Sequence, residues 1–143
     1  MQAQAGYSGT PLAKKLGLKD GQNAAFIDLP DSLSWLAQER VFANLELPSS
    51  WDALTSKDLD YVHLFTDSAA TVDAATPALR TSIRQDGMIW MSWPKKASKV
   101  PTDVTEDTIR DRAVQDILVD VKVCAVDDVW SGLKLMIRKE LRT

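Results

Sequence analysis

The segment from Trp93 to Ser98 holds the side chains best suited to binding a small charged molecule. It reads WPKKAS and places a flat ring, two ammonium groups (Lys95 and Lys96) and a hydroxyl within six residues. Ammonium groups attract anions, and a ring can pack against an apolar body. The segment therefore predicts a site for an anionic small molecule. The alternative is a solvated surface loop, since the segment lacks the glycines of a backbone nest for anions.

A second group of polar side chains follows two strand-like segments. Asp28 and Ser32 come after the first apolar run, and Thr66, Asp67 and Ser68 come after the next. In an open α/β sheet, ligands bind outside the carboxyl ends of the strands, so these residues are candidates for a ligand site. Each also has a structural interpretation. Asp67 and Ser68 can cap a helix, and Asp28 can accept backbone N–H groups in its turn.

The connection that carries Asp127, Asp128 and Trp130 is a third candidate. If it lies near the strand ends, its carboxylates could meet the two lysines of the WPKKAS segment. The alternative is a polar hairpin loop that Trp130 anchors by burying its ring.

The chain has one histidine, His63, and one cysteine, Cys124, which rules out an internal disulfide and a zinc site with several thiolates. Both lie within apolar runs, and no acid, base or nucleophile is placed beside them by the sequence. We therefore expect a hydrogen-bonded core histidine and a small buried thiol. No metal site and no cofactor are predicted.

The elements that must position these candidates have the pattern of an α/β sheet. Apolar and β-branched runs predict parallel strands near residues 23–29, 60–66, 87–93 and 119–126, and an antiparallel strand near 133–139. The order predicts a Rossmann-like fold: a mostly parallel sheet, helices on both faces and a C-terminal antiparallel hairpin. Residues 41–47 fit either a strand or irregular chain.

Helices are expected before and between these strands. The first would begin at Thr10, the second at Asp31 or Ser32, and the last at Thr105, where hydroxyl or carboxylate side chains can cap them. Pro77 interrupts the helical spacing that follows Ser68, which predicts two short helical pieces.

Composition indicates a single folded domain over residues 1–143, with 1–9 either part of it or a flexible end. Hydrophobic residues make up 45% of the chain, charged residues 26%, and the net charge is −3. This balance gives no attraction to nucleic acid or anionic membranes, and no run suits a signal or a membrane span. We expect a cytoplasmic protein. A homodimer is conceivable through an open sheet edge carrying Leu133, Leu135 and Ile137.

Four phrases of the chain are similar to a family of small bacterial proteins catalogued only as a domain of unknown function. They are GYSGTPLAKKLGLK from Gly6, DLDYVHLF from Asp58, WPKKAS from Trp93 and VDVKVCAVDDVWSGLK from Val119. The order of elements also resembles a shortened methyltransferase-type Rossmann domain. The resemblance implies the fold, but it carries no activity or catalytic residue.

The turn after the first predicted strand departs from that methyltransferase pattern. It reads DLPDS from Asp28, without the glycine that lets the backbone approach a cofactor, and Pro30 removes a donor. We therefore expect a non-catalytic binding or interaction protein on a degenerate Rossmann scaffold. The alternative is an enzyme of unassigned reaction acting on an anionic small molecule, with methyl transfer the less favoured case.

Overall fold

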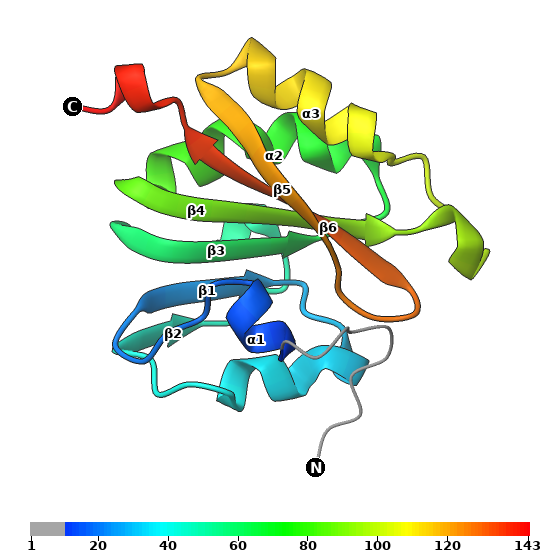
Figure 1. Ribbon diagram of the computed structural model, residues 1–143, viewed down its shortest axis with the longest axis horizontal. Helices are drawn as coiled ribbons and strands as arrows, with labels where there is room; N and C mark the ends of the chain where they lie inside the picture. Colours follow the sequence, from blue (N-terminus) through cyan, green and yellow to red (C-terminus); the bar gives the residue numbers. More distant parts are fainter. Residues whose placement is uncertain (1–10) are drawn as a thin grey trace.

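Six strands form one mixed sheet in the computed structural model, which describes residues 11–143. The order across the sheet is β2-β1-β3-β4-β6-β5, and β2, β1, β3 and β4 run parallel (Figure 1). The strands are β1 (Asn23–Ile27), β2 (Asn44–Glu46), β3 (Leu59–Phe65), β4 (Ile83–Pro94), β5 (Leu118–Ala125) and β6 (Trp130–Ile137). The predicted Rossmann-like α/β class is confirmed.

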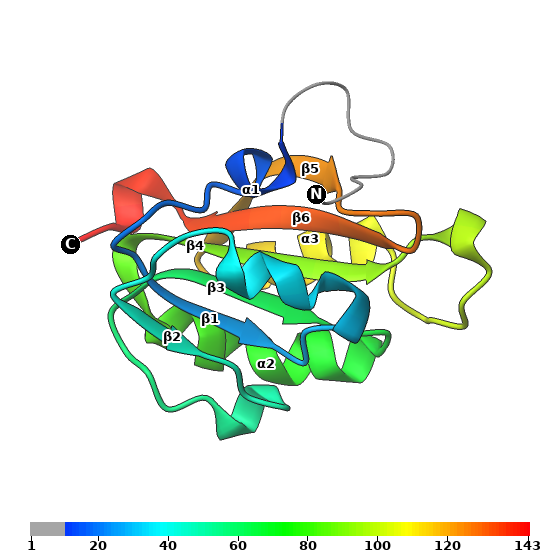
Figure 2. The same cartoon turned by 90° about the horizontal axis from the view of Figure 1, so that it is seen from below.

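Helices cover both faces of this sheet, as expected. Figure 2 shows α1 and α2 on opposite sides. The α-helices are α1 (Leu12–Lys15), α2 (Ala69–Ser82) and α3 (Glu106–Gln115), and the 3-10 helices are η1 (Asp31–Gln38), η2 (Trp51–Ala53), η3 (Lys96–Ser98) and η4 (Lys139–Leu141). No helix of residues 11–143 is long and apolar enough to cross a membrane.

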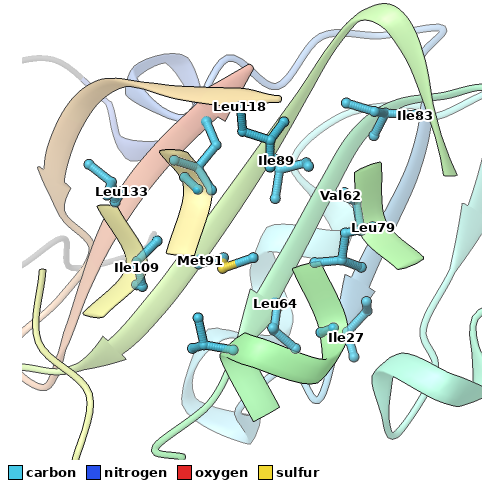
Figure 3. Close-up of a cluster of buried hydrophobic side chains, with 14 of the residues drawn as sticks. Ile27, Val62, Leu64, Leu79, Ile83, Ile89, Met91, Ile109, Leu118 and Leu133 are labelled. Carbon is cyan, nitrogen blue, oxygen red and sulfur yellow. The ribbon is translucent and has the colours of Figure 1, made fainter. Parts of the chain in front are cut away.

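The two faces of the sheet carry separate apolar cores, because side chains alternate between faces along each strand. On β3, Val62 and Leu64 pack with α2 and α3 (Figure 3), whereas Tyr61, His63 and Phe65 face α1 and η1. Burial on both faces explains why the parallel strands read as continuous apolar runs. Because β1, β3 and β4 run parallel, their carboxyl ends lie along one edge of the sheet.

The helix after β3 is continuous, so the expectation of two pieces split at Pro77 is wrong. A proline inside a helix leaves the carbonyl four residues earlier without its usual donor. Here that carbonyl belongs to Asp73, and it accepts a hydrogen bond from Nε of Arg112 on α3 at 3.3 Å. The neighbouring helix thus supplies the missing donor, and α2 runs through the proline.

The helix expected to be capped by Asp31 or Ser32 is a 3-10 helix that follows Pro30, and no side chain caps it. The expected cap at Thr10 lies outside the described residues, as do residues 1–9. Residues 41–47, which fitted either a strand or irregular chain by sequence, contain the short strand β2, which pairs with β1.

The C-terminal hairpin is confirmed, but its second strand does not end the sheet. β6 lies between β4 and β5 and pairs antiparallel with both. Its side chains Leu133, Leu135 and Ile137 are buried, so the expected open edge carrying them is wrong. Gly132 permits this close approach, since a Cβ there would lie 2.8 Å from Oγ of Ser92 on β4. The edge strands are β2 and β5.

Candidate functional site

The turn after β1 adopts a glycine-like backbone conformation without a glycine. Asp28 has φ 54°, in the left-handed region that aspartate tolerates better than most residues. Its backbone N–H donates to the carbonyl of Pro48, 2.9 Å away, and its side chain is exposed. Asp28 therefore supplies the backbone conformation that was expected to need a glycine in this turn.

A cleft of about 260 Å³ lies where β1 and β3 end, and we call it the strand-end cleft. Asp28, Trp51 and Asp67 line it, and no lysine or arginine does. Both acidic side chains are exposed, and with no cationic residue in the lining they favour a cation over an anion at this cleft. The full lining is Ile27, Asp28, Ser49, Ser50, Trp51, Leu64, Phe65, Thr66, Asp67, Ser68 and Thr71.

Ser68 and Thr66 have structural roles at the edge of this cleft. Oγ of Ser68 accepts the N–H of Thr71 at 3.2 Å and caps α2, and Oγ1 of Thr66 accepts the N–H of Ser68 at 3.1 Å. The capping interpretation is thus correct for Ser68. Asp67 does not cap the helix with its side chain. Instead its carbonyl receives donors from the loop before α3.

Glu46 ends β2, eighteen residues after Asp28, and the sequence analysis missed it. In dinucleotide-binding folds an acid about 20 residues beyond the first turn holds a ribose. Here the carboxylate accepts the backbone N–H and the hydroxyl of both Thr55 and Ser56. Burial raises the pKa of Glu46, but these hydrogen bonds outweigh it and hold the pKa below its usual value. Its position could be recognised only once the short β2 was placed.

A larger pocket of about 600 Å³ lies where β4 ends, and we call it the Trp93 pocket. Trp93 and Lys96 of the WPKKAS segment line it, but Lys95 and Ser98 do not; Lys99, which the sequence analysis did not select, does. The complete lining is Trp93, Pro94, Lys96, Lys99, Val100, Pro101, Thr102, Val104, Thr105 and Glu106. Oγ of Ser98 donates to the carbonyl of Lys95 at 2.6 Å and so shapes the turn.

The two cavities are neighbours. Asp67 lines the strand-end cleft, Thr102 lines the Trp93 pocket, and Oγ1 of Thr102 donates to the carbonyl of Asp67 at 2.9 Å. The carboxylate of Asp103 also accepts the N–H of Ala69 at 2.7 Å. These bonds hold the loop before α3 against the end of β3, so the two cavities lie next to each other at the carboxyl edge of the sheet.

The hairpin connection lines neither cavity. Oδ1 of Asp127 accepts the N–H groups of Val129 and Trp130, at 2.8 and 2.7 Å, which makes a tight polar turn. The ring of Trp130 packs edge-on against Phe65, with ring centroids 5.4 Å apart. These contacts match the structural interpretation of a polar loop with an anchoring tryptophan. Asp128 and Ser32 likewise lie outside both linings.

His63 belongs to a buried chain of hydrogen bonds. Its Nδ1 lies 2.8 Å from the hydroxyl of Tyr61, and its Nε2 lies 2.6 Å from Oγ of Ser92. Burial lowers the pKa of His63 to about 3, so the ring is neutral at physiological pH. Burial also raises the pKa of the Cys124 thiol. Both residues are core residues, as expected, and the described residues contain no cluster of side chains suited to a metal ion.

Comparisons with known proteins identify the fold. A methyltransferase from Aquifex aeolicus that depends on S-adenosylmethionine (SAM) superposes with a TM-score of 0.67 at 15% identity, covering 87% of this chain and 86% of that one. Magnesium protoporphyrin IX methyltransferase from Synechocystis, solved with bound SAM, gives 0.62 at 14% identity, with 87% and 73% covered. A SAM-dependent methyltransferase from Thiobacillus denitrificans, in complex with S-adenosylhomocysteine (SAH), gives 0.60 at 10% identity, with 89% of each chain covered.

The chain therefore has the SAM-dependent methyltransferase fold. No family model and no curated protein matches its sequence. The similarity to a domain of unknown function stays a prediction. The expectation of a non-catalytic binding protein of unknown function is overturned, because many of the solved structures that share this fold are SAM-dependent methyltransferases.

Proposed function

We propose that the chain is a SAM-dependent methyltransferase, with the cofactor in the strand-end cleft and the methyl acceptor in the adjoining Trp93 pocket. The proposal rests on the strand-end cleft, which lies at the carboxyl edge of this fold and has acidic but no basic residues in its lining. SAM carries an ammonium and a sulfonium, and the carboxylates of Asp28 and Asp67 line the cleft without a basic residue beside them. The ring of Trp51 adds a face that can pack against a cation.

The residues present fit the cationic end of the cofactor better than its ribose. Asp28 keeps the left-handed bend that brings the backbone close to a ligand. Glu46 holds the position from which an acid reaches a ribose, but its carboxylate already accepts the donors of Thr55 and Ser56. A ribose would therefore compete with the exposed Thr55 hydroxyl for Glu46.

In the proposed reaction, SAM supplies an electrophilic methyl group on sulfur. Asp28 and Asp67 would hold the cationic end of SAM, and Trp93 and its neighbours would hold the acceptor in the adjoining pocket. The hydrogen bonds from Thr102 to Asp67 and from Ala69 to Asp103 keep the two cavities next to each other. These residues contribute orientation rather than proton transfer.

Titration calorimetry with SAM and SAH tests the cofactor site. We expect the sulfonium of SAM to give tighter binding than the neutral thioether of SAH, because the lining of the cleft contains two acidic residues and no basic one. Asp28→Gly keeps the left-handed turn but removes one carboxylate, and it should weaken SAM binding about 10-fold or more, which corresponds to about 1.4 kcal/mol.

Asp58→Gly is the matched control for that titration. Asp58 has nearly the same backbone conformation, with φ 55°, but precedes β3 at the opposite edge of the sheet. This variant should bind SAM like the wild type. Equal losses in both variants, or no binding of SAM to the wild type, would refute the proposed cofactor site.

A further inference from the structure

The Trp93 pocket has the size and the walls of a small-molecule site. Its volume of about 600 Å³ falls within the usual range for ligand pockets, about 300 to 1,000 Å³. Its walls include the ring of Trp93, which is 7% exposed, and the side chains of Val100, Pro101 and Val104. Such walls favour a flat apolar body over a strongly hydrated one.

The charges of the pocket favour an anion. Lys96 and Lys99 line it, and neither forms an ion pair with any residue of the chain from 11 to 143. The acid in the lining, Glu106, is held by the guanidinium of Arg110 on the same helix. Two ammonium groups are therefore left without a partner beside an apolar wall.

Several backbone donors around the pocket already have acceptors. The N–H of Val100 donates to Oγ of Ser98 at 3.2 Å, and the N–H of Lys99 donates to the carbonyl of Lys96 at 3.1 Å. At the start of α3, Thr105 and Thr108 satisfy each other's N–H groups. The two lysines are the charged groups that can hold an anion in the pocket, and two ammonium groups suit the two oxygens of a carboxylate better than a phosphate that needs many donors.

We infer that the Trp93 pocket binds a flat, apolar small-molecule carboxylate, with Lys96 and Lys99 holding its carboxylate group. That this carboxylate is the methyl acceptor rests on the function proposed above. The chemistry agrees, because a carboxylate oxygen is already deprotonated and attacks a methyl group without a general base. The methyl–sulfur bond breaks as the oxygen–methyl bond forms, giving a methyl ester and the neutral thioether, with no proton to remove. Within residues 11–143, the lining offers no histidine and no unpaired carboxylate as a base.

Isothermal titration calorimetry with 1-naphthoate tests this inference. The neutral probe of similar shape is 1-naphthamide, and the competing anion is 1-naphthyl phosphate. The wild type should bind naphthoate at least 10-fold more tightly than the amide and more tightly than the phosphate. The double variant Lys96→Gln, Lys99→Gln should lose that preference while keeping the melting temperature of the wild type.

Lys95→Gln is the matched control, because Lys95 is adjacent in sequence but does not line the pocket. It should change naphthoate affinity less than 2-fold. Equal binding of naphthoate and naphthamide, tighter binding of the phosphate, or an equal loss in the Lys95 variant would overturn the inference. Asp28 does not line this pocket, so normal naphthoate binding by the Asp28→Gly variant, whose SAM binding is weakened, separates this inference from the cofactor site.

Discussion

Acidification from pH 7.5 to 4.5 should remove about 2 to 3 kcal/mol of stability through His63 alone. The pKa of this ring is about 3 in the folded protein and 6.5 in the unfolded chain. Because the folded value is the lower one, the unfolded state binds the extra proton. The stabilisation is complete above pH 6.5 and is lost as the pH falls toward 3. The slope within that window is about 1.4 kcal/mol per pH unit.

Urea unfolding of the wild type and of His63→Gln at several pH values measures this contribution. Glutamine can replace part of the hydrogen bonding to Tyr61 and Ser92 but does not titrate. The variant should be less stable at pH 7.5, and its stability should fall less steeply with acid, since the surface carboxylates contribute equally to both proteins. Parallel curves for the two proteins would show that His63 is not the buried neutral base described above.

Replacement of Trp90 by alanine should cost about 3 to 5 kcal/mol, with a further contribution from a lost hydrogen bond. The ring is fully buried, and its Nε1 donates to the carbonyl of Leu16 at 2.9 Å, which ties the segment after α1 to β4. Trp90→Phe keeps most of the packing but leaves that carbonyl without its donor. It should cost less than the alanine variant, about 1 to 3 kcal/mol.

Denaturant midpoints of the wild type, Trp90→Ala and Trp90→Phe measure these two losses of stability. A domain of this size has about 5 to 15 kcal/mol of stability, so the alanine variant should lose a large share of it and unfold at a clearly lower denaturant concentration. An alanine variant that is as stable as the phenylalanine variant would mean that Trp90 contributes only its hydrogen bond, and that the core between α1 and β4 is not packed as described.

Long apolar runs made the three parallel strands β1, β3 and β4 predictable from sequence, and alternating runs made the hairpin predictable; the strand near 119–126, expected among the parallel strands, is β5 and pairs only with β6, antiparallel. The run from Tyr61 to Phe65 is buried on both faces, so hydrophobicity alone marks it. β2 has no such signal, because it has three residues and Leu45 at its centre is 40% exposed. The place of β6 between β4 and β5 could not be predicted either. A hairpin pattern defines which strands pair with each other, but not which of them meets the rest of the sheet.

The candidate site was predictable only in part. The rule that ligands bind at the carboxyl ends of strands selected Asp28, Asp67, Trp93 and Lys96, and all four line one of the two cavities. Lys99 was missed because it follows a 3-10 turn that brings it back to the pocket, with φ 62°. Glu46 was missed with its strand. Lys95 was selected for its neighbours in sequence, but it does not line the Trp93 pocket.

The most direct test of the proposed function is to map SAM binding onto the sheet by amide chemical shifts in ¹H–¹⁵N spectra. Saturating SAM should shift the amides around Asp28, Trp51 and Asp67, which line the strand-end cleft. The cavity at the opposite edge, lined by Lys19, Asp20, Gly21, Gln22, Asp60, Arg84, Asp86 and Met88, serves as the internal control and should not respond. Shifts confined to that opposite edge, or an unchanged spectrum at millimolar SAM, would contradict the assignment of this chain as a SAM-dependent methyltransferase.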